Sequence, residues 1–293
     1  MTVPTIHHPE LGELFLGKKP ASPYRGISYS NDIRPGLVAS GALPSNLAAK
    51  IAGTFGHGGD LKNWGGHGNM PCDDNSIPQA DAAYQGAGDC AEAAVANKII
   101  EDALDTGLPQ PKITCATVIG WYSSQSGYEP VTGANDNGSD LQSVLEAWQT
   151  GFADTTGTNH QILEWMTIEP GNWDHMLEVD YLLEAVYPGY VITQANEDAF
   201  SQGKPWDYVP GSPELGGHCP LVVGKPSAPQ GGLLTWTRLV PFTQAFHVNQ
   251  NDEAHGVVTA GQFKRVTGKD AEGYNRGQLE EFFTLLAQQK AAA

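Results

Sequence analysis

The chain has 293 residues and a mass of 31.2 kDa, which suits one large domain or a domain of about 200 residues with an extension. With 16 Lys and Arg against 33 Asp and Glu the net charge is −17, and so acidic a surface repels phosphate backbones, which argues against nucleic acid as a partner. Hydrophobic residues make up 40%, enough for a sizeable core, but no apolar run approaches the roughly 20 residues that span a bilayer, and the first residues lack the pattern of a secretory signal.

The first 80 residues are predicted to form an extended, loop-rich arm. They show almost no helical or strand period and carry clusters of Pro, Gly, Ser and Asn, for example at 19–24 and 55–59. One short helix is compatible with residues 45–51, with Ser45 as its N-cap. We therefore divide the chain into an arm over residues 1–80 and one domain over residues 81–293.

The clearest helix of the domain is predicted to begin at Cys90. Asp89 can cap it, and Glu92 stands three residues later, as in a capping box. An apolar stripe continues to Leu104, which has the spacing of one helical face.

Two more helices are predicted before residue 188. The second follows Asp140 and stops at Gly151, and the third follows Asn172 and ends before Pro188. Their apolar faces are made by Leu141, Val144, Leu145 and Trp148 and by Met176, Val179, Leu182, Leu183 and Val186. The segments 123–126 and 136–140 are expected to be loops over a cleft.

After residue 188 the pattern changes to short β-rich segments bounded by Gly, Pro or Asn. These are the segments 190–193, 219–224, 233–236 and 256–259, and a final helix is predicted at 278–287. Helices followed by strands indicate an α+β fold, since βαβ units would alternate them.

The four cysteines are spaced unlike zinc-binding pairs or a dense disulfide framework, so reduced thiols are expected. Cys90 is the candidate nucleophile, because a Gly-rich turn delivers it to a helix N-terminus, where unpaired amides stabilise a thiolate. Gln85 can supply a donor to an oxyanion hole. Most isolated cysteines are small buried residues, and the charge of Asp89 opposes a thiolate, so the motif alone does not establish a nucleophile.

His218 is the candidate partner of that thiol. It follows Gly216 and Gly217 and enters the hydrophobic segment 219–224, where a close approach to another side chain is possible. A nucleophilic thiol needs such an imidazole to take its proton, although a lone histidine is more often a satisfied core residue. A thiol paired in this way should also alkylate faster than Cys72, Cys115 or Cys219.

The two motifs together resemble the papain-like cysteine protease superfamily, over residues 85 to 285. A Cys at a helix N-terminus precedes Gly-Gly-His by more than 100 residues, as in papain-like proteases. The resemblance is closer still to phage-encoded and bacterial papain-like proteins. It rests on Gly-Asp-Cys-Ala at 88–91, Gly-Tyr-Glu-Pro at 127–130, Gly-Gly-His at 216–218, Thr-Trp at 235–236 and Asp-Glu-Ala at 252–254.

This resemblance implies an α+β fold in which a helical subdomain starts at the nucleophile helix and an antiparallel β subdomain carries the histidine. It implies Cys90 as nucleophile, His218 as general base and Gln85 as oxyanion donor, with no cofactor and no metal. The residues that it implies for the substrate cleft are Gly88, Asp89, Gly217 and Trp236.

Two departures from the family pattern concern the residues around the catalytic pair. Leu234 stands where papain-like proteases have the Asn that orients the imidazole, so Thr235 or Asp252 is expected to take that role. Gln85 lies five residues before Cys90 where the family has six. The residues that can equally occupy the oxyanion position are Tyr84 and Asn75.

Two functions follow from the resemblance. The first is a thiol hydrolase that cleaves a peptide or peptide-like amide through an acyl-enzyme on Cys90, with a peptide or protein as its partner. The second is a virion structural or decoration protein that keeps the scaffold without catalysis and has capsid or tail subunits as partners. Either function places the protein in a virion or in host cytoplasm. The residues His57, His67 and Cys72 are interpreted as part of a loop rather than as a metal site.

Overall fold

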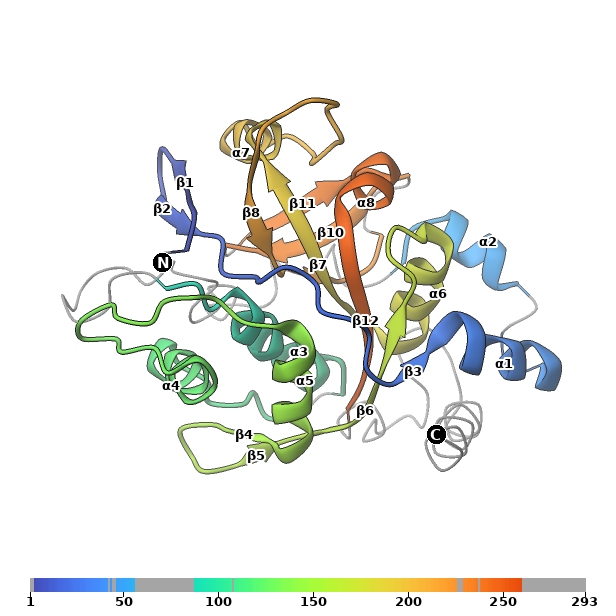
Figure 1. The fold of residues 1–293 in the computed structure, drawn as a ribbon. Coiled ribbons are helices and arrows are strands. Elements are labelled where there is room, and N and C mark those ends of the chain that lie inside the picture. Colours follow the sequence, from blue (N-terminus) through green and yellow to red (C-terminus); the bar gives the residue numbers. More distant parts are fainter. Residues whose placement is uncertain are drawn as a thin grey trace.

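The computed structural model describes residues 3–41, 43, 46–55, 87–106, 108–225, 229–236 and 238–259. Helices and strands are mixed along this part of the chain, around one large sheet (Figure 1). The helices are α1 (Arg34–Ser40), α2 (Leu47–Ala52), α3 (Cys90–Thr106), α4 (Cys115–Ser126), α5 (Leu141–Thr150), α6 (Trp173–Leu183), α7 (Gln194–Ser201) and α8 (Gln244–Gln250), and a π-helical turn covers Tyr29–Ile33. The strands are β1 (Thr5–His8), β2 (Gly12–Phe15), β3 (Ile27–Ser28), β4 (Phe152–Ala153), β5 (Asn159–His160), β6 (Ile162–Ile168), β7 (Val186–Thr193), β8 (Glu214–His218), β9 (Leu221–Val222), β10 (Gly231–Thr235), β11 (Arg238–Phe242) and β12 (Asn251–Thr259).

The large sheet has the strand order β11-β10-β9-β7-β12-β6-β3, and β8 pairs with β7 beside this path. Its neighbouring strands are antiparallel, except that β3 runs parallel to β6. The pairs β1–β2 and β4–β5 form separate hairpins. The predicted antiparallel β part is therefore confirmed.

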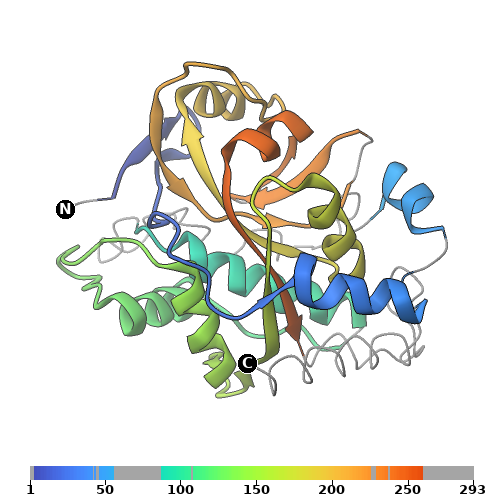
Figure 2. The same cartoon turned by 45° about the vertical axis from the view of Figure 1, so that its right-hand side comes forward.

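Each face of the sheet carries its own hydrophobic core. Successive side chains of a strand point to opposite faces, and Leu233 and Leu234 of β10 accordingly join different cores, as do Val258 and Val257 of β12. The core that contains Leu234 and Val257 is covered by α3, α4 and α5, whereas the other is covered by α6 and α8 together with α1 and α2. Figure 1 and Figure 2 show these two groups of helices on opposite sides of β7 and β12.

The three predicted helices of the domain are present. Helix α3 begins at Cys90, as the sequence indicates. Asp140 caps α5 by accepting a hydrogen bond of 2.9 Å from the backbone N–H of Ser143, and Asn172 caps α6 through the N–H of His175 at 3.1 Å. Local capping chemistry therefore sets the starts of α5 and α6.

The predicted end of the third helix is wrong. Helix α6 stops at Leu183, where Glu184 turns into the left-handed region with φ of 66°, and Val186 and Pro188 belong to strand β7. Strand β7 lies between β12 and β8 in the sheet. Pairing on both edges favours a strand here over another helical turn.

Two other local predictions are also corrected. Residues 123–126 form the last turn of α4, not a loop, because Thr114 and Thr117 make a reciprocal capping box that starts a helix at Cys115. The short helix expected at 45–51 is α2, and its N-cap is Asn46. The helix predicted at 278–287 lies outside the described residues.

The described part of the arm contains regular structure and packs on the rest of the chain. Strand β3 adds to the large sheet, and Ile33, Leu37 and Leu47 enter the core that α6 covers. Figure 1 shows the blue segment after β2 passing between the helical group α3–α5 and strands β7 and β8. The boundary proposed near residue 80 falls outside the described residues. Within the described residues, no helix is both long and apolar enough to cross a membrane.

Candidate active site

The start of α3 is held by hydrogen bonds to a loop that follows α4. The backbone N–H of Gly88 donates to Asp136 Oδ1 at 3.0 Å, and the Tyr122 hydroxyl donates to the same oxygen at 2.7 Å. Burial raises the pKa of Asp136, although the bonds from Tyr122 and Gly88 oppose that shift. The turn that delivers Cys90 is therefore fixed by a buried carboxyl group.

Glu92, in the first turn of α3, connects this helix to Ser139, which lies in the same loop as Asp136. The Ser139 hydroxyl donates to Glu92 Oε1 at 2.8 Å. Burial raises the pKa of Glu92 to about 7, even though the bond from Ser139 favours the charged form. The acidic residue that the sequence assigns to a capping box thus contacts the loop that precedes α5.

His218 is the last residue of strand β8, whereas the sequence predicts that it leads into a β-rich segment at 219–224. It pairs with Tyr190 of β7, and its ring stacks on Trp236 with centroids 4.3 Å apart and planes 14° apart. Its Nε2 atom lies 2.6 Å from the Thr235 hydroxyl oxygen. Complete burial lowers the pKa of His218 to about 3, so the ring is neutral at pH 7.

The ring of Trp236 is held in place by its surroundings. Trp236 is fully buried and has φ of 44°, in the left-handed region that L side chains occupy at a cost of about 1–2 kcal/mol. Its contacts with Trp206 and Phe200, at centroid distances of 5.8 and 4.9 Å, help to offset that cost. The imidazole of His218 therefore rests against a rigid aromatic wall.

Cys90 and the residue after His218 lie in one neighbourhood. Cys90, Cys219 and Tyr187 are buried in the same core, and the Tyr187 hydroxyl donates to the carbonyl oxygen of Ala91 at 3.1 Å. Burial raises the pKa of the Cys219 thiol, and the nearby Cys90 adds to that shift. The start of α3 and the residue that follows strand β8 are thus adjacent.

The arm passes between these two segments. Gly17 packs so closely on Gly88 that a Cβ on Gly17 would overlap the Gly88 carbonyl group. The next residue, Lys18, donates its backbone N–H to the carbonyl oxygen of Gly217 at 3.0 Å. Two consecutive arm residues therefore touch the backbone just before Cys90 and just before His218. Both of these side chains are fully buried.

Asp252 contacts a different partner from the one expected. Its Oδ2 atom lies 2.8 Å from Lys18 Nζ, and the described contact at His218 Nε2 is the one with Thr235. Of the two residues that the sequence offered as orienter of the imidazole, the structure therefore places Thr235 on the ring and Asp252 in an ion pair with the arm.

The four residues expected in the cleft surround these same groups, and all are partly or fully buried: Gly88, Asp89, Gly217 and Trp236. Several other candidates lie outside the described residues, namely Gln85, Tyr84 and Asn75 for the oxyanion position and His57, His67 and Cys72 for a metal. Among the residues that the structure does describe, no group of three or more His, Cys, Asp or Glu is arranged to hold a metal ion.

Sequence reasoning missed Asp136, Tyr122 and Lys18. The Asp-Asn-Gly turn at 136–138 gave a local signal, which was interpreted only as a loop. Tyr122 is 14 residues from Asp136, and Lys18 is 234 residues from Asp252, so no local pattern connects either pair.

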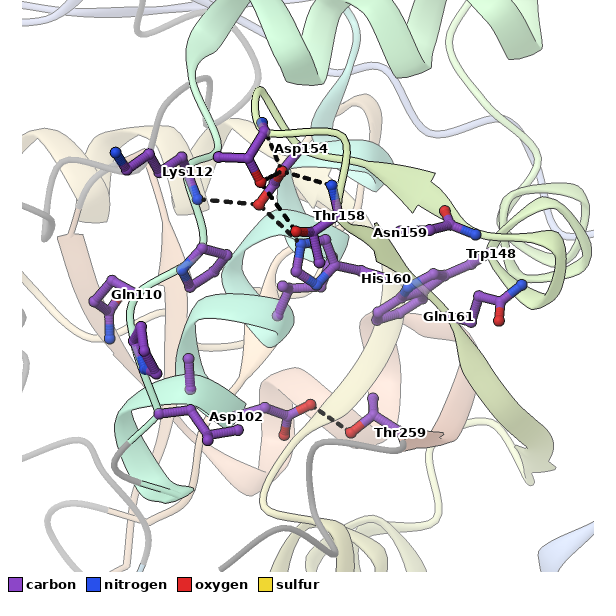
Figure 3. A pocket seen from close by; sticks show the side chains of 16 residues that line it. Asp102, Gln110, Lys112, Trp148, Asp154, Thr158, Asn159, His160, Gln161 and Thr259 are labelled. Carbon is purple, nitrogen blue, oxygen red and sulfur yellow. Dashed lines mark hydrogen bonds and ion pairs between the residues drawn. The ribbon is translucent and has the colours of Figure 1, made fainter.

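A cavity of about 470 Å³ lies elsewhere, beside the C-terminal half of α3. Figure 3 shows Asp154 between the segment that carries Lys112 and the hairpin that carries His160. Burial alone would raise the pKa of Asp154, but hydrogen bonds from Thr156, His160 and the Lys112 backbone outweigh it and lower this pKa to about 2. Asp154 thus connects the segment that contains Lys112 to the β4–β5 hairpin. Asp102 of this cavity is 12 residues from Cys90, or about 18 Å along the helix, so the cavity is separate from the candidate pair.

Comparison with known proteins identifies the fold of this chain. No family model and no curated protein matches the sequence. Among solved structures the chain is similar to xylellain, a cysteine protease from Xylella fastidiosa, with 12% identity and a TM-score of 0.56 over 89% of this chain and 98% of that chain. The chain has the papain-like fold. The predicted α+β papain-like architecture is therefore confirmed.

Two further solved structures match the chain at lower scores. Procathepsin B S9 from Trypanosoma congolense is 11% identical, with a TM-score of 0.48 over 74% of this chain and 81% of that chain. Procathepsin L 3 from the larval midgut of Tenebrio molitor is 12% identical, with a TM-score of 0.44 over 77% and 89%. In the papain-like fold of the present chain, Cys90 begins the central helix and His218 lies on the β side.

Proposed function

We propose that this protein is a thiol hydrolase that cleaves a peptide or peptide-like amide through an acyl-enzyme on Cys90. One arrangement supports it: a cysteine opens the helix of a papain-like fold, and a histidine held by Thr235 and Trp236 ends the adjacent strand. The backbone just before each of these residues, at Gly88 and Gly217, touches the same extended stretch of the arm, and we propose that a peptide substrate lies there.

We assign Nδ1 of His218 as the base, because Nε2 is the nitrogen in contact with the Thr235 hydroxyl. When Nε2 carries the proton and donates to the Thr235 hydroxyl, Nδ1 keeps a lone pair and accepts the proton of the Cys90 thiol. The sulfur then attacks the carbonyl carbon of the amide. The protonated imidazole returns the proton to the leaving amine as the C–N bond breaks, and water releases the acid from the thioester in a second step.

The negative oxygen that forms during attack needs hydrogen-bond donors. The backbone N–H of Cys90, at the N-terminus of α3, is one such donor, and we assign the second to Gln85. A neutral Thr235 stabilises an imidazolium less than a carboxylate would. A burial-depressed histidine pKa near 3 also makes a poor base, so we expect the pKa to rise when the cleft is opened to water.

The test is turnover of a library of internally quenched peptides by the full chain, with products identified by mass spectrometry. The assay compares the wild type, Cys90→Ala and the matched control Cys115→Ala, which removes a half-buried thiol of α4. We expect Cys115→Ala to keep the activity and Cys90→Ala or His218→Gln to lower it at least 1000-fold. The Gly17→Val chain, whose new side chain cannot fit against Gly88, is assayed in parallel to open the cleft.

In whichever of the wild-type and Gly17→Val chains hydrolyses peptide, turnover that is unchanged by adding Cys90→Ala would refute the acyl-enzyme. If neither the wild type nor the Gly17→Val chain hydrolyses any peptide, the scaffold is not catalytic, and a structural role as a virion component becomes the better interpretation.

A further inference from the structure

The segment of the arm from Leu16 to Lys19 is bound as an extended peptide on both of its edges. On one edge, Gly17 O accepts a hydrogen bond of 2.7 Å from the N–H of Ser139, and the N–H of Lys19 donates to Ser139 O at 2.9 Å. On the other edge, the N–H of Lys18 donates to Gly217 O at 3.0 Å. Main-chain pairing of this kind holds an extended peptide regardless of its sequence.

Three glycines shape the groove around this segment. A Cβ on Gly138 would overlap the carbonyl group of Gly17, and one on Gly217 would overlap the carbonyl of Lys18. Gly88 also touches Gly17, with its own Cβ position 2.9 Å from the Gly17 Cα. The groove therefore approaches the backbone of its occupant, and specificity has to come from side-chain pockets.

The side chain of Lys18 fills one such pocket. Its Nζ atom lies 2.8 Å from Asp252 Oδ2 and 3.1 Å from Glu253 Oε1, and the side chain is fully buried. Gly189 makes room for it, because a Cβ there would overlap Lys18 Cε. Two carboxylates thus face one ammonium group, and Glu253 also contacts His255, with Oε2 3.2 Å from the His255 Nε2 atom.

The ammonium stays charged in this place. Burial lowers the pKa of Lys18, but the charges of Glu253 and Asp252 outweigh it and raise the pKa above its usual value. The backbone N–H of Lys18 donates to the carbonyl oxygen of Gly217, the residue before His218, so the pocket lies beside the candidate catalytic pair.

We propose that the pocket of Gly189, Asp252 and Glu253 is a subsite that selects a lysine side chain of the peptide substrate, and that Lys18 occupies it here as a ligand supplied by the arm. This inference rests on the proposed peptide hydrolase function. An extended lysine-containing peptide would use the same three backbone bonds as the arm. The acidic protein, with its net charge of −17, also attracts cationic peptides.

The experiment separates binding from catalysis by using full-length Cys90→Ala chains. The probe is a fluorescein-labelled peptide that copies residues 12–22, and its analogue has norleucine in place of Lys18, which removes the charge and keeps the aliphatic stem. Fluorescence anisotropy is measured with Cys90→Ala alone and with added Gly17→Val, which expels the arm. The matched control is Gly120→Val, where an added Cβ meets nothing within 4 Å.

We expect the Gly17→Val chain to bind the lysine peptide at least tenfold tighter than the norleucine peptide and at least tenfold tighter than the Gly120→Val chain does. Adding Asp252→Asn should reduce the preference for lysine at least threefold, whereas Asp198→Asn, an exposed aspartate of α7, should not change it. If Gly17→Val does not fold, Lys18→Met replaces it, with the exposed Lys19→Met as its control.

Equal binding of the two peptides, or no binding by the opened chain, would overturn the subsite and leave Lys18 as an anchor of the arm only. Lysine-dependent binding without turnover in the corresponding Cys90-containing chain would overturn the hydrolase and keep the pocket. The two failures are therefore distinguishable.

Discussion

Replacing Thr235 with Val tests whether this hydroxyl orients the imidazole. Thr235 and His218 are both fully buried, and their polar atoms lie 2.6 Å apart. Valine fills nearly the same volume, so the substitution removes the hydrogen bond without opening a cavity. A buried donor left without a partner costs about 1–3 kcal/mol.

That cost should appear in both stability and rate. We expect the free energy of unfolding of Thr235→Val, measured by urea denaturation, to fall by about 1–3 kcal/mol. If the same interaction is needed in the transition state, kcat/KM should fall about 10- to 100-fold. Because the imidazole can then rotate, the pH profile of Cys90 alkylation in the opened Gly17→Val chain should change as well.

Two other substitutions are the controls. Thr167→Val removes a comparably buried hydroxyl that donates to Ile27 O at 3.1 Å, so it should lower stability without changing the pH profile. Thr235→Ser keeps the hydroxyl and should retain most of the activity. An unchanged kcat/KM in Thr235→Val, or an equal loss in Thr167→Val, would refute the role of Thr235 as the orienter.

Two more predictions follow from burial. The pKa of Glu92 is about 7 in the folded chain and 4.5 ordinarily, so its contribution to stability is complete below pH 4.5 and is lost as the pH rises through 7. Between pH 4 and pH 8 the free energy of unfolding of Glu92→Gln should therefore rise, relative to that of the wild type, by up to about 3 kcal/mol. Urea denaturation at both pH values checks this, with the exposed Glu129→Gln as control, and parallel pH curves for wild type and Glu92→Gln would contradict it. The sequence predicts that Cys90 alkylates faster than Cys115, but Cys90 is fully buried, so we expect iodoacetamide to label the half-buried Cys115 of the wild type first. Peptide mapping should show the order predicted from the sequence, Cys90 first, in Gly17→Val. Rapid labelling of Cys90 in the wild type would show that the arm does not cover the thiol.

The sequence by itself determined the elements that local chemistry controls. A helix that starts at Cys90 and the caps at Asp140 and Asn172 are written in short stretches of chain. The helical and strand patterns on either side of residue 188 are also local, but the structure corrects their strict order, because strand β6 lies before that residue and helices α7 and α8 lie after it. From these came the α+β class and the resemblance to papain-like proteases. Predictions failed where a distant partner overrode local preference. Val186 fits the helical pattern of the sequence, but it lies in strand β7 because it pairs with Gly256 of β12.

Only the tertiary structure decided which side chains meet. The sequence offers both Thr235 and Asp252 as partners of His218, and the fold separates them, because Asp252 contacts Lys18, 234 residues away. The bond from Gly88 to Asp136 likewise joins residues 48 positions apart. Such contacts depend on how strands and loops are packed, because hydrogen bonds and ion pairs form between neighbours in space, and local periodicity carries no information about which distant residues become neighbours.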